Sequence, residues 1–360
     1  MRARAVIGAN FGDEGKGLVT DYLCARYGAG MVVRFNGGAQ AGHTVATPDG
    51  LRHEFHHFGS GTLAGVPTFL SQFFTLNPIV FFKEMDELQA IGITPTVYAH
   101  PDCLVTTFAD MLINQRIEDG RGAGRHGSVG LGVNETYERS QVPELRITMS
   151  DLWNGVDLRA RLEKICGKYA EFRTGTKIAD ADDMIAAFVR GCEKFAGLVN
   201  PLGIGQCKDP IFEGAQGLLL DQENKEFFPH VTRSRTGMHN VRLLCQQAGI
   251  TQIEAYYVSR TYVTRHGAGP LPRENAAMSF PDDTNVEHPY QGRLRFAPLD
   301  TDELTKRCRD DCGDNDFSLV LTHCDQLAAP CHADLYAYGP TRDHVKVSTA
   351  AAPVARINRS

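Results

Sequence analysis

The sequence contains no apolar run long enough to cross a membrane and no excess of basic residues. A membrane-spanning helix requires about 20 consecutive, mostly apolar residues. The 360 residues carry a formal net charge of -6, whereas proteins that bind nucleic acid or membrane surfaces usually have a basic footprint. The N-terminus leads into a strand-like run without the pattern of a signal peptide. These absences predict a cytoplasmic protein that binds neither nucleic acid nor membranes.

The ten cysteines show neither the regular spacing of a disulfide framework nor a complete zinc motif. Cys308 and Cys312 have the spacing of half a metal site, but no second Cys/His pair at zinc spacing accompanies them. Most of the others lie in apolar or helical surroundings. We therefore interpret the cysteines mainly as buried thiols.

The first distinctive stretch is a glycine-rich loop between a predicted strand and a predicted helix. Residues 5–7 form an apolar run typical of a buried parallel strand, and residues 18–23 have helical spacing. A loop in this position offers backbone N–H groups and a helix N-terminus to a phosphate. It is not a Walker loop, because Asn10 occupies the position of the first glycine and Gly17 follows the lysine in place of Ser or Thr.

This opening loop also carries two carboxylates beside its lysine. Asp13 and Glu14 precede Lys16. Carboxylates repel phosphate unless a metal ion or a proton transfer is involved. The acidic pair therefore predicts chemistry beyond simple phosphate binding.

Strand-like and helix-like patterns alternate along the rest of the chain, which predicts an α/β fold with a large, mostly parallel sheet flanked by helices. A chain of this length and 42% hydrophobic content can form one large α/β domain or two ordinary ones. Because no repeat or linker is evident, we expect a single domain over residues 1–360 with small excursions. Further strands are predicted at 30–35, 96–99, 256–264 and 318–321, a helix at 80–90, and two or three scaffold helices within 151–200.

Three other segments are rich in glycine or polar residues. Residues 37–44 follow the strand at 30–35, so this loop and the opening loop are expected to meet at one edge of the sheet. Residues 116–136 combine many glycines with three cations, which is typical of a flap that closes over an anion or of a solvated surface loop. Residues 281–294 are polar and predict a mobile segment.

Together, in chain order, these loops resemble the adenylosuccinate synthetase family. The resemblance spans residues 5–343, with His266 where the family has valine and His323 where it has lysine. It implies a P-loop-related fold and a homodimeric, Mg²⁺-dependent C–N ligase of purine biosynthesis. The matching motifs are residues 12–17, 40–44, 213–217, 231–233, 264–270 and 322–325.

The family joins aspartate to C6 of a 6-oxopurine nucleotide, and it uses a nucleoside triphosphate to phosphorylate the 6-oxygen first. This step requires a base for the N1 proton and a cationic or acidic group beside the developing charge. By resemblance, Asp13 is the base and His43 is the acid or electrostatic stabiliser. Lys16 holds the γ-phosphoryl group, and Gln216 faces the purine edge as a fourth catalytic residue.

The resemblance also implies which residues bind each substrate. The triphosphate set is Gly12, Glu14, Gly15, Lys16, Gly17, Gly42, His43, Thr44, Asp325 and Gly339. The nucleotide monophosphate set is Asp13, Gln40, Ser128, Arg139, Gln216 and Thr232, with Arg139 reaching a neighbouring subunit's nucleotide. Arg293 and Arg295 match the arginines that bind the aspartate carboxylates, and Asp13 and the Gly42 carbonyl match the Mg²⁺ ligands.

Each of these residues also has an ordinary structural interpretation. Asp13 suits a helix cap, His43 suits a core position after a glycine turn, and the pair Arg293 and Arg295 suits a solvated surface. The motifs around them favour the functional interpretation.

Several departures from the family pattern bear on the substrate. The chain is short, the flap and the aspartate loop are atypical, and His323 replaces the lysine that stacks along guanine. These departures favour the bacteriophage branch, which makes 2-aminoadenylosuccinate from dGMP with ATP or dATP for DNA that contains diaminopurine. Asp13 instead favours the alternative, an enzyme that uses IMP and GTP. A nucleotide-binding switch without ligase activity is a further alternative.

Overall fold

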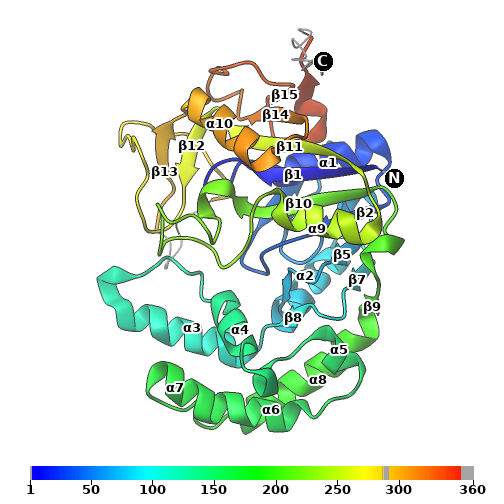
Figure 1. The fold of residues 1–360 in the computed structure, drawn as a ribbon, viewed down its shortest axis with the longest axis vertical. Helices are drawn as coiled ribbons and strands as arrows, with labels where there is room; N and C mark the ends of the chain where they lie inside the picture. The colour runs from blue at the N-terminus through cyan, green and yellow to red at the C-terminus, as the bar shows by residue number, and fades with distance from the viewer. Residues whose placement is uncertain (1, 286, 288–291, 350–360) are drawn as a thin grey trace.

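The computed structural model describes residues 2–285, 287 and 292–349, and a ten-stranded sheet runs through it (Figure 1). The strand order is β16-β15-β14-β11-β1-β10-β2-β5-β7-β9, and only β15 and β16 pair antiparallel. The expected large, mostly parallel sheet flanked by helices is therefore confirmed. The strands are β1 (Arg2–Gly8), β2 (Met31–Arg34), β5 (Thr68–Leu70), β7 (Val97–Ala99), β9 (Asn200–Pro201), β10 (Pro210–Gly217), β11 (Gln252–Arg260), β14 (Phe317–Thr322), β15 (Leu335–Ala337) and β16 (Val345–Val347).

Helices cover both faces of this sheet. Ala5 and Ile7 of β1 pack in one core cluster with α9 (Met238–Ala248) and α10 (Thr301–Cys312). Val6, which points the other way, packs in a second cluster with α1 (Lys16–Tyr27). Because both faces of the central strands are buried, their sequences are nearly continuous apolar runs.

A group of helices lies beyond the β7 and β9 end of the sheet, in the lower part of Figure 1. It confirms the scaffold helices expected within 151–200, and it packs in a third apolar cluster together with α2 (Pro78–Ala90). The group contains α3 (Phe108–Arg121), α4 (Val133–Ser140), α5 (Met149–Trp153), α6 (Leu158–Lys164), the π-helical turn η4 (Ile165–Tyr169), α7 (Ala170–Thr174) and α8 (Asp182–Leu198).

Small two-stranded sheets and single 3-10 turns complete the described chain, in which no helix has the length and apolar character needed to span a bilayer. The small sheets pair β3 (His43–Ala46) with β4 (Arg52–Phe55), β6 (Thr75–Leu76) with β8 (Leu104–Val105), and β12 (Tyr262–Arg265) with β13 (Arg295–Pro298). The turns are η1 (Thr62–Ala64), η2 (Gly122–Gly124), η3 (Pro143–Leu145), η5 (Ile204–Gln206), η6 (Leu218–Leu220) and η7 (Arg342–His344).

Two expected segments have different boundaries in the structure. The strand predicted at 256–264 is two strands, because the chain leaves the main sheet after Arg260 and β12 pairs with β13 instead. The loop predicted at 116–136 is mostly helical. A capping box at Thr107 starts α3, which continues to Arg121, so the stretch without helix or 3-10 turn is only 125–132.

The mobile segment expected at 281–294 falls partly on 286 and 288–291, which lie outside the described residues.

The ten cysteines are free thiols, eight of them buried. Cys308 and Cys312 face the core between α10 and the sheet. Among the described residues no group of three or more His, Cys, Asp or Glu side chains is arranged to hold a metal ion. The interpretation of the cysteines as buried thiols is confirmed.

Candidate active site

The predicted loops at 12–17, 37–44 and 323–325 follow the carboxyl ends of β1, β2 and β14, and the motif at 213–217 forms the carboxyl end of β10. This is the edge at which parallel α/β sheets bind ligands. Gly8 at the end of β1 pairs with Gly217 at the end of β10, after a break in the register. A side chain on Gly8 would collide with the Gln216 carbonyl and the Glu14 carboxylate. These two glycines therefore let the opening loop pack directly on the end of β10.

The opening loop is folded around the side chain of Glu14. One carboxylate oxygen accepts hydrogen bonds from the N–H groups of Asn10 (3.0 Å) and Gly12 (2.9 Å), and the other lies 2.7 Å from Lys16 Nζ. Both Glu14 and Lys16 are buried. The Glu14 side chain thus organises the loop from within, and Lys16 has to change partners to reach a phosphate.

Asp13 stands on this loop in the left-handed backbone region, with φ 60°. Its carbonyl accepts a hydrogen bond of 2.6 Å from Arg260 Nε, while its carboxylate makes no hydrogen bond to any described residue. Burial raises the pKa of the Asp13 carboxyl, and the positive charges of Arg260 and Lys16 oppose that rise. A carboxylate with a raised pKa and a free edge is suited to accept a proton from a ligand.

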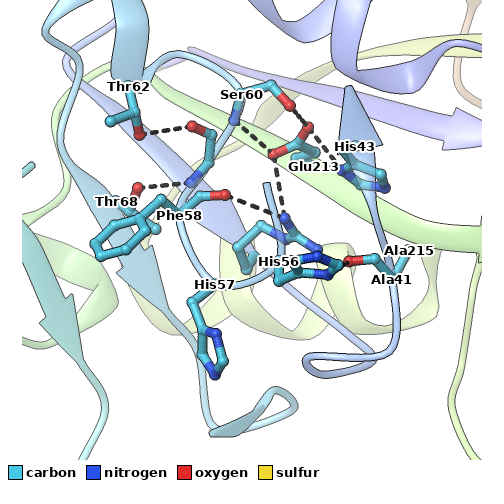
Figure 2. Close-up of polar contacts among 12 residues, drawn as sticks. Ala41, His43, His56, His57, Phe58, Ser60, Thr62, Thr68, Glu213 and Ala215 are labelled. Carbon is cyan, nitrogen blue, oxygen red and sulfur yellow. Dashed lines mark hydrogen bonds and ion pairs between the residues drawn. The ribbon is translucent and has the colours of Figure 1, made fainter. Parts of the chain in front are cut away.

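His43 at the start of β3 is held by a buried carboxylate on β10, as Figure 2 shows. Its Nδ1 lies 2.9 Å from Glu213 Oε1, and Glu213 also accepts hydrogen bonds from the backbone N–H and the hydroxyl of Ser60. Arg34 Nη1 lies 3.8 Å from the other oxygen of Glu213. This network fixes the imidazole ring through Nδ1 and leaves Nε2 for a ligand.

The two partners titrate far from their ordinary ranges. Burial lowers the pKa of His43 to about 4, despite the opposing charge of Glu213. Burial alone would raise the pKa of Glu213, but His43, Arg34 and Ser60 together lower it to about 2. The resting pair is therefore a neutral imidazole and an ionised carboxylate.

Three partly buried side chains near these loops each have a buried atom without a hydrogen-bond partner in the described chain: Gln40 Oε1, Gln216 Oε1 and Thr44 Oγ1. Gln216 Oε1 and Gln40 Nε2 both lie within 4 Å of the point that a Cβ on Gly37 would occupy. Native proteins leave few buried polar atoms unpaired, because the desolvation cost is about 1–3 kcal/mol each. The side-chain amides of Gln40 and Gln216 thus lie close together, and their oxygens are suited to accept hydrogen bonds from a polar ligand.

The expected role of Arg139 does not agree with its position in α4. Its side chain is fully buried, and its guanidinium bonds both Asp110 oxygens (2.8 and 3.0 Å) and the Val105 and Leu145 carbonyls. An arginine held in this way cannot extend to a nucleotide of another subunit without breaking a buried ion pair. In this structure Arg139 joins α4 to α3 and β8, and its role at a neighbouring subunit's nucleotide stays a prediction.

Of the two arginines predicted to bind aspartate, one is exposed to solvent and the other is hydrogen-bonded to protein groups. Arg293 is exposed, and the neighbouring Gly292 carbonyl lies 3.0 Å from His266 Nε2. Arg295 instead bonds Glu274 and the carbonyls of Gly267 and Gly269, each at 2.8 Å. It therefore stabilises the loop after β12 in this structure.

The flap residue Ser128 is held by a neighbouring helix. Ser128 Oγ donates to Asn114 Oδ1 on α3 (2.8 Å). A Cβ on the adjacent Gly127 would lie 3.0 Å from the Ala268 N, so the flap contacts the loop after β12.

The remaining predicted residues lie on separate loops. Thr232 N donates to the Leu220 carbonyl, and Asp325 is exposed just beyond β14. A side chain on Gly339 would press on the His344 ring, so this glycine lets the loop after β15 pack against η7.

His323, in the motif at 322–325, lies just beyond the end of β14. His323 has φ 56°, and its Nδ1 lies 2.9 Å from Thr322 Oγ1. Burial lowers the pKa of His323 to about 3. The neutral ring therefore lacks the positive charge of the lysine that it replaces.

Sequence reasoning gave no role to the buried charges that support the site, namely Arg34, Glu213 and Arg260. Arg34 and Arg260 are the last residues of β2 and β11, and Glu213 lies in the middle of β10. Charged residues are rarely buried without a partner. A charge within a strand-like apolar run is the signal that would have identified them.

The sequence was compared with protein families and with curated proteins, and both comparisons found the same family. The family model for adenylosuccinate synthetase matches residues 5–326. The adenylosuccinate synthetase of Thermoplasma acidophilum is 30% identical over 283 residues, which cover 76% of this chain and 64% of the relative. That of Gloeothece citriformis is 33% identical over 284 residues, which cover 75% of this chain and 61% of the relative. The matches thus span less than two thirds of these relatives.

Two solved structures share the fold. Fully ligated adenylosuccinate synthetase from Plasmodium falciparum aligns with a TM-score of 0.76 at 18% identity, over 96% of this chain and 99% of that one. Cyanophage S-2L succinoaminodeoxyadenylate synthetase, bound to dGMP and dATP, aligns with a TM-score of 0.62 at 14% identity, over 96% and 95%. At these identities the likeness concerns the fold alone.

Proposed function

The chain belongs to the adenylosuccinate synthetase family, and from this we propose that it is a nucleoside-triphosphate-dependent C–N ligase that joins L-aspartate to C6 of a 6-oxopurine nucleotide. The observation that carries the proposal is the grouping of unsatisfied and activated polar groups at one sheet edge. These are the Asp13 carboxylate and the amide oxygens of Gln40 and Gln216, which have no hydrogen-bond partner among the described residues, and the pair of His43 with Glu213. A pure nucleotide binder needs no base of raised pKa beside its phosphate loop.

The chemistry follows from these groups. Asp13 takes the N1 proton, so that the 6-oxygen becomes nucleophilic and attacks the γ-phosphorus, and the nucleoside diphosphate leaves. The amine of aspartate then attacks C6, and inorganic phosphate leaves with the former 6-oxygen. A phosphate beside His43 Nε2 favours the imidazolium form, which Glu213 stabilises through Nδ1. His43 then supplies positive charge where negative charge develops.

Mg²⁺ fits the oxygen atoms of this site. The carboxylate of Asp13 has no protein hydrogen bond among the described residues, and Gly42 is exposed beside His43. Mg²⁺ usually takes one or two protein oxygens and completes its octahedron with phosphate oxygens and water. When bound, it neutralises the charge on the transferring phosphates.

We assign IMP and GTP as the first substrate pair, in place of the dGMP pair that the sequence departures favoured. The curated relatives at 30–33% identity are adenylosuccinate synthetases, and the phage origin expected from the departures is not confirmed. Asp13, retained here, also favours IMP. The second candidate pair is dGMP with ATP or dATP. It is supported by His323, a neutral residue at the position where the family has the lysine that accompanies guanine recognition. A homodimer remains a prediction.

The test is a matrix of substrates. Purified protein is incubated with aspartate, Mg²⁺ and each of GTP, ATP or dATP, with IMP, GMP or dGMP in turn, and succinylated products are identified by mass. We expect product with IMP and GTP. Product only with dGMP and ATP or dATP would replace the first pair with the second. If no combination yields product while nucleotides still bind, the protein would instead be a nucleotide-binding switch without ligase activity.

A further inference from the structure

Asn10 occupies the position at which a Walker loop has its first glycine, and the proposed reaction gives it no task. In the structure, both its backbone and its side chain are hydrogen-bonded. Its side-chain Nδ2 donates to Ser259 Oγ (2.9 Å), its N–H donates to Glu14 Oε1 (3.0 Å), and its carbonyl accepts from Leu219 N (2.9 Å). Asn10 thus ties the loop to the ends of β10 and β11.

The remaining acceptor of Asn10 is taken by an arginine from another layer. Arg307 of α10 donates from Nη2 to Asn10 Oδ1 and from Nε to the Ala9 carbonyl, both at 2.7 Å. Both hydrogen bonds come from the same planar guanidinium, so their relative geometry is fixed. Only a guanidinium can span a backbone and a side-chain acceptor in this way, because an ammonium is a point donor.

A chain of hydrogen bonds continues from this clamp to the proposed base. Ser259 Oγ, which accepts from Asn10, donates to the Arg260 carbonyl (2.7 Å), and Arg260 Nε donates to the Asp13 carbonyl (2.6 Å). The position of Asp13 in the left-handed region is therefore supported from Arg307 through Asn10.

Arg307 makes no ion pair with any described residue, although its side chain is mostly buried. Its only hydrogen bonds in the described chain go to neutral acceptors of the opening loop. The carboxylates of Glu303, Glu14 and Asp300 act on Arg307 only through longer-range electrostatics. The direct hydrogen bonds of the guanidinium are therefore given to the opening loop.

The guanidinium is also accessible from outside. Arg307 lines a surface groove of about 400 Å³ between α10, η6 and the start of α9, together with Leu218, His239 and Lys306. Helix α10 packs on the face of the sheet opposite α1, so this groove opens away from the phosphate-loop helix. A small cation can therefore enter if the arginine side chain is removed.

We propose that Arg307 is a positioning residue, which holds Asn10 and Ala9 so that the opening loop presents Asp13 to the purine N1. This role rests on the proposed ligase activity. It acts on turnover through the geometry of the loop, without contact between Arg307 and a substrate.

The experiment compares Arg307→Ala and Arg307→Lys with Lys306→Ala, a matched change in the same groove at a residue that makes no hydrogen bond or ion pair with the described part of the opening loop. We expect Arg307→Ala to lower kcat about 10- to 100-fold with a nearly unchanged KM for aspartate, because small misplacements of a catalytic group cost about this much. Added guanidinium at non-denaturing concentration should restore part of the loss, whereas urea should not. Arg307→Lys should stay impaired, and Lys306→Ala should match the wild type.

Wild-type kcat in Arg307→Ala, or a loss that guanidinium fails to restore, would overturn the proposal. If Arg307→Ala does not fold, full kcat in a folded Arg307→Lys overturns it equally. Amide hydrogen exchange of residues 9–17 is measured in parallel and should be faster in the arginine variant than in Lys306→Ala. If the wild type makes no product, the proposed function fails, while unchanged exchange would reject the role of Arg307 separately.

Discussion

The Nδ1 atom of His43 lies 2.9 Å from a carboxylate oxygen of Glu213, and both side chains are buried. The two residues are 170 positions apart in the sequence, on β3 and β10. This contact engages Nδ1 of the imidazole and leaves Nε2 without a partner among the described residues. It also places a negative charge beside the ring, which would stabilise the imidazolium form.

We predict that Glu213→Gln lowers kcat by about 100-fold, in the range of a lost acid–base contribution. The amide keeps the volume and one acceptor oxygen for the Ser60 N–H, but it removes the charge that stabilises protonated His43. Steady-state kinetics and a thermal melt measure the two effects. Ser60→Ala removes one donor and keeps the charge, so it serves as the matched control. A Glu213→Gln enzyme with normal kcat would contradict the role of the pair.

The pKa shifts of the same pair predict how stability depends on pH. Because His43 is neutral in the fold down to a pKa of about 4, the unfolded chain binds more protons between pH 6.5 and 4. The free energy of unfolding should therefore fall as the pH falls through this window, by up to about 3 kcal/mol from His43. Urea denaturation of the wild type and His43→Gln at several pH values measures it. An equal slope in both proteins would contradict the assignment to His43.

We predict that Asp13→Asn reduces turnover by about 100-fold or more while nucleotide binding stays measurable. Asparagine has the same size but cannot take the N1 proton. Because burial raises the pKa of Asp13, the acidic limb of kcat/KM in the wild type should lie above the ordinary aspartate range. Titration calorimetry and a pH–rate profile measure the two properties. Surviving turnover in Asp13→Asn would remove Asp13 as the base.

Arg139→Ala is predicted to act on stability and not on substrate affinity. Removing the guanidinium leaves Asp110 buried without its partner, which costs about 3–5 kcal/mol. Urea denaturation measures the loss, and KM for the nucleotide should be unchanged in whatever fraction remains folded. Arg146→Ala, which removes a nearby arginine whose side chain is exposed, is the control. A raised KM at normal stability would restore the role that the resemblance suggested.

Much of the fold could be predicted from local patterns. The apolar runs at 5–7, 30–35 and 318–321 became strands of the main sheet because parallel strands are buried on both faces. The break at Thr261 was missed, because the change from the main sheet to β12 depends on pairing with β13, a strand from a later part of the chain. Helix α3 extended into the glycine-rich stretch for a similar reason, since local glycine content does not outweigh a well-capped, packed helix.

The sequence by itself determined the family, the glycine loops and the strands that carry them, because these depend on short-range spacing and backbone freedom. Tertiary structure decided what each charge does. Glu14 lies inside its loop, Arg139 and Arg295 bond protein groups, and Glu213 orients His43. The physical reason is that a buried charged side chain needs a polar partner to offset its desolvation, so the partner determines its role. These partners come from distant segments of the chain.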